Sequence, residues 1–400
     1  MKPHFEVVVV GGGITGLTFA ALLAESQREA SLGITLLDAG ARPQIPAGDE
    51  ISLRVSAISS GSARLLESVG AWQLISNSRL SPYECMRVWD EDGTPDGAAA
   101  LRFDAAEFAV PQLGFIVENV LLQDALLRQL DTTNVELQFA SPIRSLRQSG
   151  RQYKVELEGG VCRTADLVVG ADGSRSFVRR AAAIETRKWP YDQTAFVTHL
   201  RPEFEHQATA WQRFLRSGPL GILPLADGRV SVVWSTTPEL AKRALDASDE
   251  ALGTMLADAS DRVLGELAAA GPRGAFALGA QHARRYVLPG IALIGDAAHA
   301  IHPLAGQGAN LGLQDAAELA SVLHTALQTG LHPGDEPVLR RYERARKGAN
   351  ATMLHFMTGL NRLFATDSRL VGELRSFGMR IFNRSGPIRE RAVKVALGVR

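Results

Sequence analysis

The stretch Val7-Val8-Val9-Val10-Gly11-Gly12-Gly13-Ile14-Thr15-Gly16 decides the fold of this 400-residue chain. Four consecutive valines favour a buried strand of a parallel sheet, and the apolar residues from Gly16 to about Ala24 favour a helix. Gly11, Gly13 and Gly16 form the pattern G-x-G-x-x-G. This pattern permits a tight turn, close approach of a pyrophosphate to the helix start, and close packing of helix on strand. The stretch therefore predicts a strand, a phosphate-binding turn and a helix in succession.

A second predicted strand, Ile34 to Leu37, follows this helix and ends at Asp38. The acid lies about 20 residues past the glycines, where a carboxylate can accept hydrogen bonds from the ribose hydroxyls of an adenosine. Strand, glycines, helix, strand and terminal acid together predict an α/β fold that begins with a Rossmann-like domain and binds a dinucleotide.

Another glycine-rich run lies near residue 300. An apolar strand ends in Gly295, where the backbone can approach a ligand closely, and Asp296 offers an acceptor for a ribityl hydroxyl. Gly306 and Gly308 permit an unusual backbone path before a helix predicted to begin at Ala309. A helix start carries roughly half a positive charge, which suits the anionic N1 and C2 carbonyl end of a reduced isoalloxazine. Any one glycine is typical of an ordinary loop, but the whole run indicates a flavin.

A third segment, Asp166 to Ser176, contains another short apolar strand and ends in a turn that carries Asp172. An Asp-Gly pair also favours an ordinary exit turn from a strand, so this segment is not specific by itself.

In this order, the three segments resemble those of the flavin-dependent aromatic hydroxylases related to para-hydroxybenzoate hydroxylase. Within that group, the chain most resembles the ubiquinone-biosynthesis hydroxylases, and the likeness spans nearly its full length. Other segments that carry the likeness are Leu53 to Ser59, Leu66 to Trp72, Val88-Trp89, Phe103 to Ala105, Gly114 to Asn119, Leu223 to Leu225, Val233 to Ser235 and Ala392 to Gly398.

The resemblance implies a set of residues around FAD. They are Gly11, Gly13, Gly16, Asp38, Arg54, Gln123, Asp172, Gly295, Asp296, Pro303, Gly306, Gly308 and Asn310. The first four would hold the ADP half, Arg54 would lie along the cofactor between pyrophosphate and flavin, and the last four would border the isoalloxazine. For Arg54 and Gln123, a surface salt bridge and a solvated helix residue are the alternatives.

The resemblance also implies the chemistry. Reduced flavin reacts with O2 to give a C4a-hydroperoxide that hydroxylates an electron-rich ring, and NAD(P)H is the expected transient electron donor, although the sequence contains no recognisable NAD(P)H motif. The catalytic contribution of the chain would be the positioning loop with Pro303 and Gly306. His299 and His302 are candidates for a proton role because an imidazole in general titrates near neutrality. An ordinary hydrogen-bonding role is the stronger interpretation, and a metal site is not expected. The apolar strand residues expected to form walls of the site are Phe196, Phe214, Ile222, Leu223 and Trp234.

The substrate implied by the resemblance is a hydrophobic prenylated phenol or benzoquinol on the way to ubiquinone. Features of both early and late ring hydroxylases are mixed here, so the ring carbon stays open. Two alternatives stay open as well: an FAD hydroxylase of a small soluble aromatic, and a flavin-binding scaffold subunit of a quinone-biosynthesis complex. An intact loop from Pro303 to Asn310 argues against a scaffold.

Composition excludes other classes of function. The chain has 43 basic and 43 acidic residues, which gives no global attraction to nucleic acid. Cys85 and Cys162 are too few for a disulfide framework and indicate a reducing compartment. Neither a signal peptide nor a spanning apolar run is recognisable, so we expect a cytoplasmic protein with at most peripheral contact at the inner face of the membrane.

The alternation of predicted strands and helices, read with the resemblance, predicts an interleaved domain organisation. Residues 1–72, 107–180 and 276–345 form the FAD-binding domain, residues 73–106 and 181–275 form a substrate-binding β-sheet domain, and residues 346–400 form C-terminal helices. Between Arg384 and Arg400, five basic residues against Glu390 give a net charge of +4. This region could contact a membrane surface or a partner in a multiprotein complex, or be the solvated face of a packed helix. A homo-oligomer is a further expectation.

Overall fold

The computed structural model describes residues 4–25, 31–46, 50–75, 77–301, 307–366, 377–383, 385–386, 389–391 and 393. Its first layer is a six-stranded sheet in the order β18-β19-β12-β1-β2-β8, parallel except for the β18–β19 pair. The strands are β1 (His4–Val10), β2 (Ser31–Leu37), β8 (Glu136–Gln138), β12 (Leu167–Gly170), β18 (Val287–Leu288) and β19 (Ile291–Leu293). The four valines of β1 lie in the centre and are buried, as expected for a parallel strand covered on both faces.

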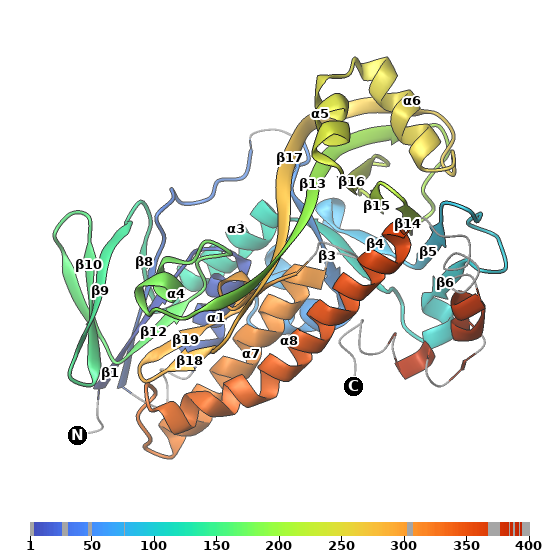
Figure 1. Cartoon of the computed structure of the whole chain (residues 1–400). Helices are drawn as coiled ribbons and strands as arrows, with labels where there is room; N and C mark the ends of the chain where they lie inside the picture. The colour runs from blue at the N-terminus through green and yellow to red at the C-terminus, as the bar shows by residue number, and fades with distance from the viewer. Residues whose placement is uncertain are drawn as a thin grey trace.

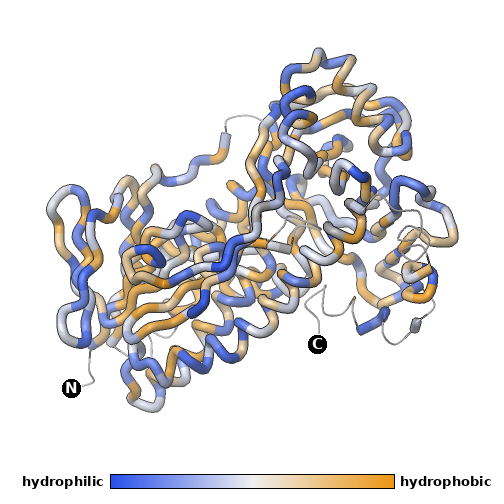
Figure 2. Tube along the Cα trace, viewed as in Figure 1, coloured by the Kyte–Doolittle hydropathy of each residue, from blue (hydrophilic) through white to orange (hydrophobic). Residues whose placement is uncertain are grey.

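Helices cover this sheet and form its core with it. Helix α1 (Ile14–Ala24) packs against α3 (Asn119–Leu130) and α7 (Gln307–Gln328), and α7 packs against α8 (Glu336–Ala365). Figure 1 shows α7 and α8 side by side beneath the sheet. The strands β12, β18 and β19 are mostly orange in Figure 2, which fits their place in the largest hydrophobic cluster. Shorter helices are α2 (Ser60–Ser68) and α4 (Phe177–Ala181).

Two smaller sheets flank this domain. The sheet β3-β7-β4 joins Val55–Ser59, Gly114–Glu118 and Ser81–Tyr83, and it lies next to the start of α7. A hairpin with a third strand, β9 (Ile143–Ser149), β10 (Gln152–Leu157) and β11 (Cys162–Ala165), lies at the edge of the molecule (Figure 1).

The second domain is an eight-stranded sheet in the order β20-β17-β13-β16-β15-β14-β5-β6. Its strands are β5 (Cys85–Asp90), β6 (Leu101–Asp104), β13 (Thr186–Pro202), β14 (Thr209–Leu215), β15 (Gly218–Pro224), β16 (Val230–Thr236), β17 (Leu267–Ala283) and β20 (His299–Ala300). Helices α5 (Pro238–Asp246) and α6 (Asp249–Ala259) pack on one face. The long strands β13 and β17 run from the first domain into the second (Figure 1).

The observed elements confirm an α/β fold with an interleaved β-sheet domain. Helix α7 begins before the predicted start at Ala309 and extends beyond Leu323. The division predicted between residues 275 and 276 falls inside β17, and that between 345 and 346 falls inside α8. Each of these elements is continuous across the predicted division, so β17 and α8 connect the two regions as shared secondary structure.

Candidate cofactor and active site

The glycine turn between β1 and α1 is shaped by close backbone contacts. Gly11 has a φ of +115°, and a Cβ there would lie 2.3 Å from the Ala171 carbonyl oxygen. A Cβ at Gly16 would lie 2.0 Å from the Gly11 carbonyl oxygen. Neither position has room for a side chain, which explains the first and third glycines of the pattern.

Gly13 differs from the other two glycines. A Cβ there would meet no protein atom within 4 Å. Gly13 is also the N-cap of α1, with no side-chain cap and no acidic residue in the first turn. The first N–H groups of this helix therefore face open space and suit a phosphate.

Two predicted cofactor residues brace this turn from outside. The Asp38 carboxylate accepts from Gly12 N at 2.5 Å and from Gly40 N at 2.7 Å. Gln123 Nε2 donates to the Gly12 carbonyl oxygen at 3.1 Å. The structure thus places both next to the glycine turn, and the alternative of a purely solvated Gln123 is excluded by this contact.

The segment that follows β12 lies against the same turn. Ala171 N donates to the Val10 carbonyl oxygen at 2.7 Å. Asp172 Oδ2 accepts from Phe177 N at 2.6 Å and from Val178 N at 3.1 Å, and so orders the start of α4. Asp172 Oδ1 is buried and has no partner among the described residues. A buried orphan acceptor is costly, and a cofactor hydroxyl would satisfy it.

Gly295 and Asp296 lie in a 3₁₀ turn, Gly295–Ala297, after β19. Gly295 has a φ of +58°, and a Cβ there would lie 3.1 Å from the Thr15 side chain of α1. A Cβ at Gly312 of α7 would lie 2.4 Å from Thr15 Oγ1. These close approaches bring α1, the turn and α7 together, so the glycine turn, Asp172 and Gly295 surround one location.

Asp296 is exposed on one side, yet neighbouring protein atoms remove part of its hydration and raise its pKa. The charges of His299 and Arg54 oppose this rise. Arg54 is exposed, and its carbonyl oxygen accepts from Asn119 N at 3.0 Å.

Asn310, which was predicted to border the isoalloxazine, is bound to the backbone of β3. Its side chain is buried, donates to the Ala57 carbonyl oxygen at 2.8 Å and accepts from Ser59 N at 2.9 Å. Asn310 therefore fixes the first turn of α7 against β3. A Cβ at Gly308, in the same turn, would meet no protein atom within 4 Å. Pro303, Gly306 and His302 lie outside the described residues.

Sequence reasoning missed a buried polar network next to the turn. His299 is 2% exposed and lies 2.5 Å from Asp315 of α7, which also contacts Gly295 N and two side chains of α8. His299 is thus a hydrogen-bonding residue, in line with the preferred interpretation. A signal for Asp315 existed in the sequence, since an acid four residues after Leu311 and four before Leu319 shares their buried helix face. Among the described residues, no group of three or more potential metal ligands occurs.

Three of the apolar residues that were expected to line the site point away from the first domain. Phe196, Ile222 and Trp234 pack with α5 and α6 on the far face of the eight-stranded sheet. Successive side chains alternate between the faces of a strand, so their neighbours turn the other way. Leu223 packs instead against β3, β4 and β7 of the first domain, and Phe214 packs against α8.

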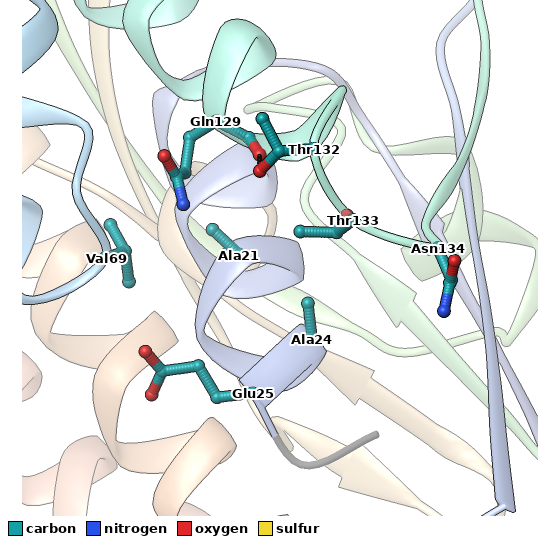
Figure 3. Close-up of a pocket in the computed structure, with 8 residues that line it drawn as sticks. All are labelled: Ala21, Ala24, Glu25, Val69, Gln129, Thr132, Thr133 and Asn134. Carbon is teal, nitrogen blue, oxygen red and sulfur yellow. Dashed lines mark hydrogen bonds between the residues drawn. The ribbon is translucent and has the colours of Figure 1, made fainter. Parts of the chain in front are cut away.

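A separate hollow of about 410 Å³ lies at the other end of α1 (Figure 3). It is lined by Ala21, Ala24, Glu25, Val69, Gln129, Thr132, Thr133 and Asn134. The eleven residues of α1 follow Gly13 and end at Ala24, a length of about 16 Å at the usual rise per residue. This hollow is therefore distinct from the location that the three segments surround.

Comparisons with known proteins agree with this geometry. The chain matches the family described as FAD binding domain over residues 4–357. It is 34% identical to 3-demethoxyubiquinol 3-hydroxylase of Escherichia coli K12 over 395 residues, 98% of each chain. It is 36% identical to ubiquinone hydroxylase UbiL of Rhodospirillum rubrum, over 98% of this chain and 89% of that protein. The crystal structure of PqsL, a probable FAD-dependent monooxygenase from Pseudomonas aeruginosa, has a TM-score of 0.76 at 22% identity and covers 94% of this chain and 99% of its own.

Proposed function

This chain belongs to the ubiquinone-biosynthesis branch of the FAD-dependent aromatic hydroxylases, and from that premise we propose that it hydroxylates the ring of a polyprenylated phenol or benzoquinol. O2 supplies the oxygen atom, NAD(P)H supplies two electrons as a hydride, and solvent supplies one proton. One oxygen atom enters a ring C–H bond, and the other leaves as water as the nicotinamide is oxidised.

The described residues fit FAD. Gly13 and the free N–H groups of α1 suit the pyrophosphate, and Asp38 suits the adenosine ribose. The orphan Oδ1 of Asp172 and the exposed carboxyl of Asp296 are acceptors for hydroxyl groups of the cofactor. When bound and reduced, FAD supplies the activation of dioxygen that no amino-acid side chain provides.

The chain itself positions these groups and excludes water. Thr15, between Gly295 and Gly312, keeps α1, the 3₁₀ turn and α7 at a fixed spacing. On the substrate side, Leu223 and Leu225 pack with Ile116 and Tyr83 between the two domains. Such apolar surroundings suit a hydrophobic ring and disfavour entry of water, which would waste reductant. For a proton role in the reaction, we propose no residue.

The observation that carries the proposal is the convergence of Gly13, Asp172 and Gly295 in a chain that aligns over 98% of its length with a demethoxyubiquinol hydroxylase. The test is deletion of the gene in its host, followed by mass spectrometry of the quinone pool. We expect loss of ubiquinone and accumulation of a precursor that lacks one ring hydroxyl group, whose mass names the ring position.

Complementation sharpens this experiment. Wild-type protein and the control variant Asp258→Ala, at an exposed position of α6, should restore the pool, whereas Asp296→Ala should not. An unchanged quinone pool in the deletion strain would reject the proposal. In that case, oxidation of NAD(P)H stimulated by simple water-soluble phenols would support the small-aromatic alternative, and neither activity would support a scaffold.

We also propose that the C-terminal region makes peripheral contact with the membrane that holds the substrate. Phe356 of α8 and Phe377 and Ile381 of a helix over 377–383 are 58%, 56% and 52% exposed, and exposed apolar side chains favour such a surface. Arg389, one of the basic residues of this region, is instead held internally by the Arg102 carbonyl oxygen and Glu107. No helix in the described ranges is both long and apolar enough to cross a bilayer.

Sedimentation with anionic phospholipid vesicles tests this contact. The wild-type protein should sediment with the vesicles, and the double variant Phe377→Ser with Ile381→Ser should remain in the supernatant. Equal sedimentation of both proteins would mean that Phe377 and Ile381 do not form the membrane contact. Light scattering of the same samples reports whether a homo-oligomer forms, and co-purification from the host reports membership of a quinone-biosynthesis complex.

A further inference from the structure

Asp315 lies inside α7, next to the turn that carries Asp296, and its side chain is fully buried. Its Oδ2 accepts from Gly295 N at 3.1 Å and from His299 Nε2 at 2.5 Å. Its Oδ1 accepts from Arg346 Nε at 2.8 Å and from Asn350 Nδ2 at 3.0 Å. Both oxygens of one buried carboxylate are thus occupied by two donors each.

These four donors belong to different parts of the fold. Gly295 starts the 3₁₀ turn, His299 lies in β20, and Arg346 and Asn350 lie one turn apart on α8. β20 pairs with β17, where His282 stands opposite His299. One side chain therefore joins the turn, the edge of the second sheet and both long helices.

We propose that Asp315 is a positioning residue for the flavin: it holds the backbone of Gly295, and through it Asp296, at the place where the cofactor binds. This inference rests on the proposed function in one respect, namely that FAD is the ligand. It predicts the affinity of the protein for FAD and the reduction potential of the bound flavin, and it does not depend on the identity of the substrate.

The charges of this network also act on Asp296. Burial opposes ionisation of Asp315, but His299 and Arg346 outweigh it and hold the pKa of this carboxyl below its ordinary value. The site therefore keeps a fixed negative charge directly beneath the turn. His299 lowers the pKa of Asp296 and Asp315 raises it, so the charges of the network are felt at the residue that faces the cofactor.

An amide cannot replace this carboxylate. Asparagine has one acceptor oxygen and one NH2 donor. In the variant Asp315→Asn, the NH2 group would face either Gly295 N and His299, or Arg346 and Asn350. At least one donor of the network would lose its partner, and the negative charge would be gone. The turn would move, and the cofactor would experience a more positive environment.

Asp166→Asn is a matched control. Asp166 is also buried, accepts from Glu6 N at 2.8 Å, and contacts Gln152 and His332 side chains at 3.0 and 3.2 Å. It lies at the start of β12, the end of the strand away from Asp172. About five residues of strand, roughly 17 Å, separate it from the cofactor location. Both variants remove a buried carboxylate that binds a backbone N–H and a histidine.

The experiment uses the full-length protein. Apoprotein is titrated with FAD by fluorescence, and the reduction potential of the bound flavin is measured with reference dyes. For Asp315→Asn we expect at least a tenfold rise in the Kd for FAD and a shift of the potential to more positive values. For Asp166→Asn we expect a comparable loss of melting temperature with Kd and potential unchanged. An Asp315→Asn protein with wild-type Kd and potential would overturn the inference and leave Asp315 a structural residue.

A second pair of variants keeps the test decisive if Asp315→Asn does not fold. His299→Leu removes one donor from the carboxylate, whereas the amide of His299→Gln can still donate to it. We expect weaker FAD binding and an altered potential for His299→Leu, and recovery of both for His299→Gln. Equal values for the two variants would contradict the inference. A wild-type protein that binds FAD but hydroxylates no aromatic ring would reject the proposed function and leave this comparison intact.

Discussion

Replacing Gly13 by alanine should separate cofactor binding from folding. A Cβ at this position meets no protein atom within 4 Å, and the backbone, with φ of −76° and ψ of 173°, suits alanine. Alanine is a poorer N-cap than glycine, by up to about 1 kcal/mol, but it also reduces the entropy of the unfolded chain by about 0.4–1 kcal/mol. These effects oppose each other, so the stability of the apoprotein should change by less than about 1 kcal/mol.

The cofactor should respond much more strongly. The added methyl group projects into the open space in front of α1, where the pyrophosphate is expected. Displacing the phosphate from the helix start would cost at least one hydrogen bond to a charged group, about 1.5–3 kcal/mol. At about 1.4 kcal/mol per factor of ten, the Kd for FAD should rise roughly ten- to hundredfold.

Two measurements decide the matter: thermal unfolding of the apoprotein, and fluorescence titration of the apoprotein with FAD. Gly348→Ala, at an exposed position of α8 that is equally free of protein contacts, is the matched control and should leave the affinity unchanged. If Gly13→Ala binds FAD as tightly as the wild type, the pyrophosphate does not approach α1 at this position, and the reasoning about the glycine turn is wrong.

Other predictions concern the neighbours of the site. Asp172→Asn keeps one oxygen for the start of α4 but loses the orphan acceptor, so FAD titration should show about tenfold weaker binding at nearly unchanged melting temperature; an unchanged Kd would refute a role for Oδ1. Glu118→Gln breaks the ion pair between Glu118, 3% exposed, and Arg79, 18% exposed. The free energy of unfolding in urea should fall by about 1.5–3 kcal/mol, the value of a hydrogen bond to a charged group, and a change within error would mean that the pair contributes nothing. Burial, with help from His299, lowers the pKa of His282 from 6.5 to about 4. The unfolded state therefore binds more protons between these values, and stability should fall as the pH drops from 6.5 toward 4. The fall should be smaller in His282→Gln, and parallel curves of melting temperature against pH would contradict this.

Much of the fold was predictable because its signals are local. Within about thirty residues, the sequence contains a buried strand, the glycines that a tight phosphate-binding turn needs, and an acid that can bind a ribose. The structure brings these segments together as expected. Gln123 was predicted from resemblance alone, and its bond to Gly12 explains that position physically.

The errors lie where a side chain's direction depends on distant parts of the chain. Phe196, Ile222 and Trp234 were expected to line the site because they are apolar, but α5 and α6 cover their face of the sheet. In a sheet that is covered on both faces, both sets of alternating residues are apolar, so hydrophobicity cannot tell which set faces the cofactor.

The polar network shows the same limit. An acid on the buried face of α7 was detectable in the sequence. Its partners Arg346 and Asn350 lie on another helix, and their four-residue spacing does not show that they bind Asp315. The position of Asn310 beside the isoalloxazine stays a prediction, but its bonds to the backbone of β3 could not be read from the sequence. In both cases a polar residue beside the expected site supports the backbone around it.

The most direct test of the central claim is the fate of dioxygen. Purified protein loaded with FAD is supplied with NAD(P)H and a prenylated benzoquinol or phenol under isotopically labelled dioxygen, and the products are analysed by mass spectrometry. We predict a ring-hydroxylated product that contains one labelled oxygen atom, in proportion to nicotinamide oxidised. Consumption of NAD(P)H without a labelled ring product, from a protein saturated with FAD, would contradict the claim that this chain is a flavin-dependent hydroxylase of prenylated aromatic rings.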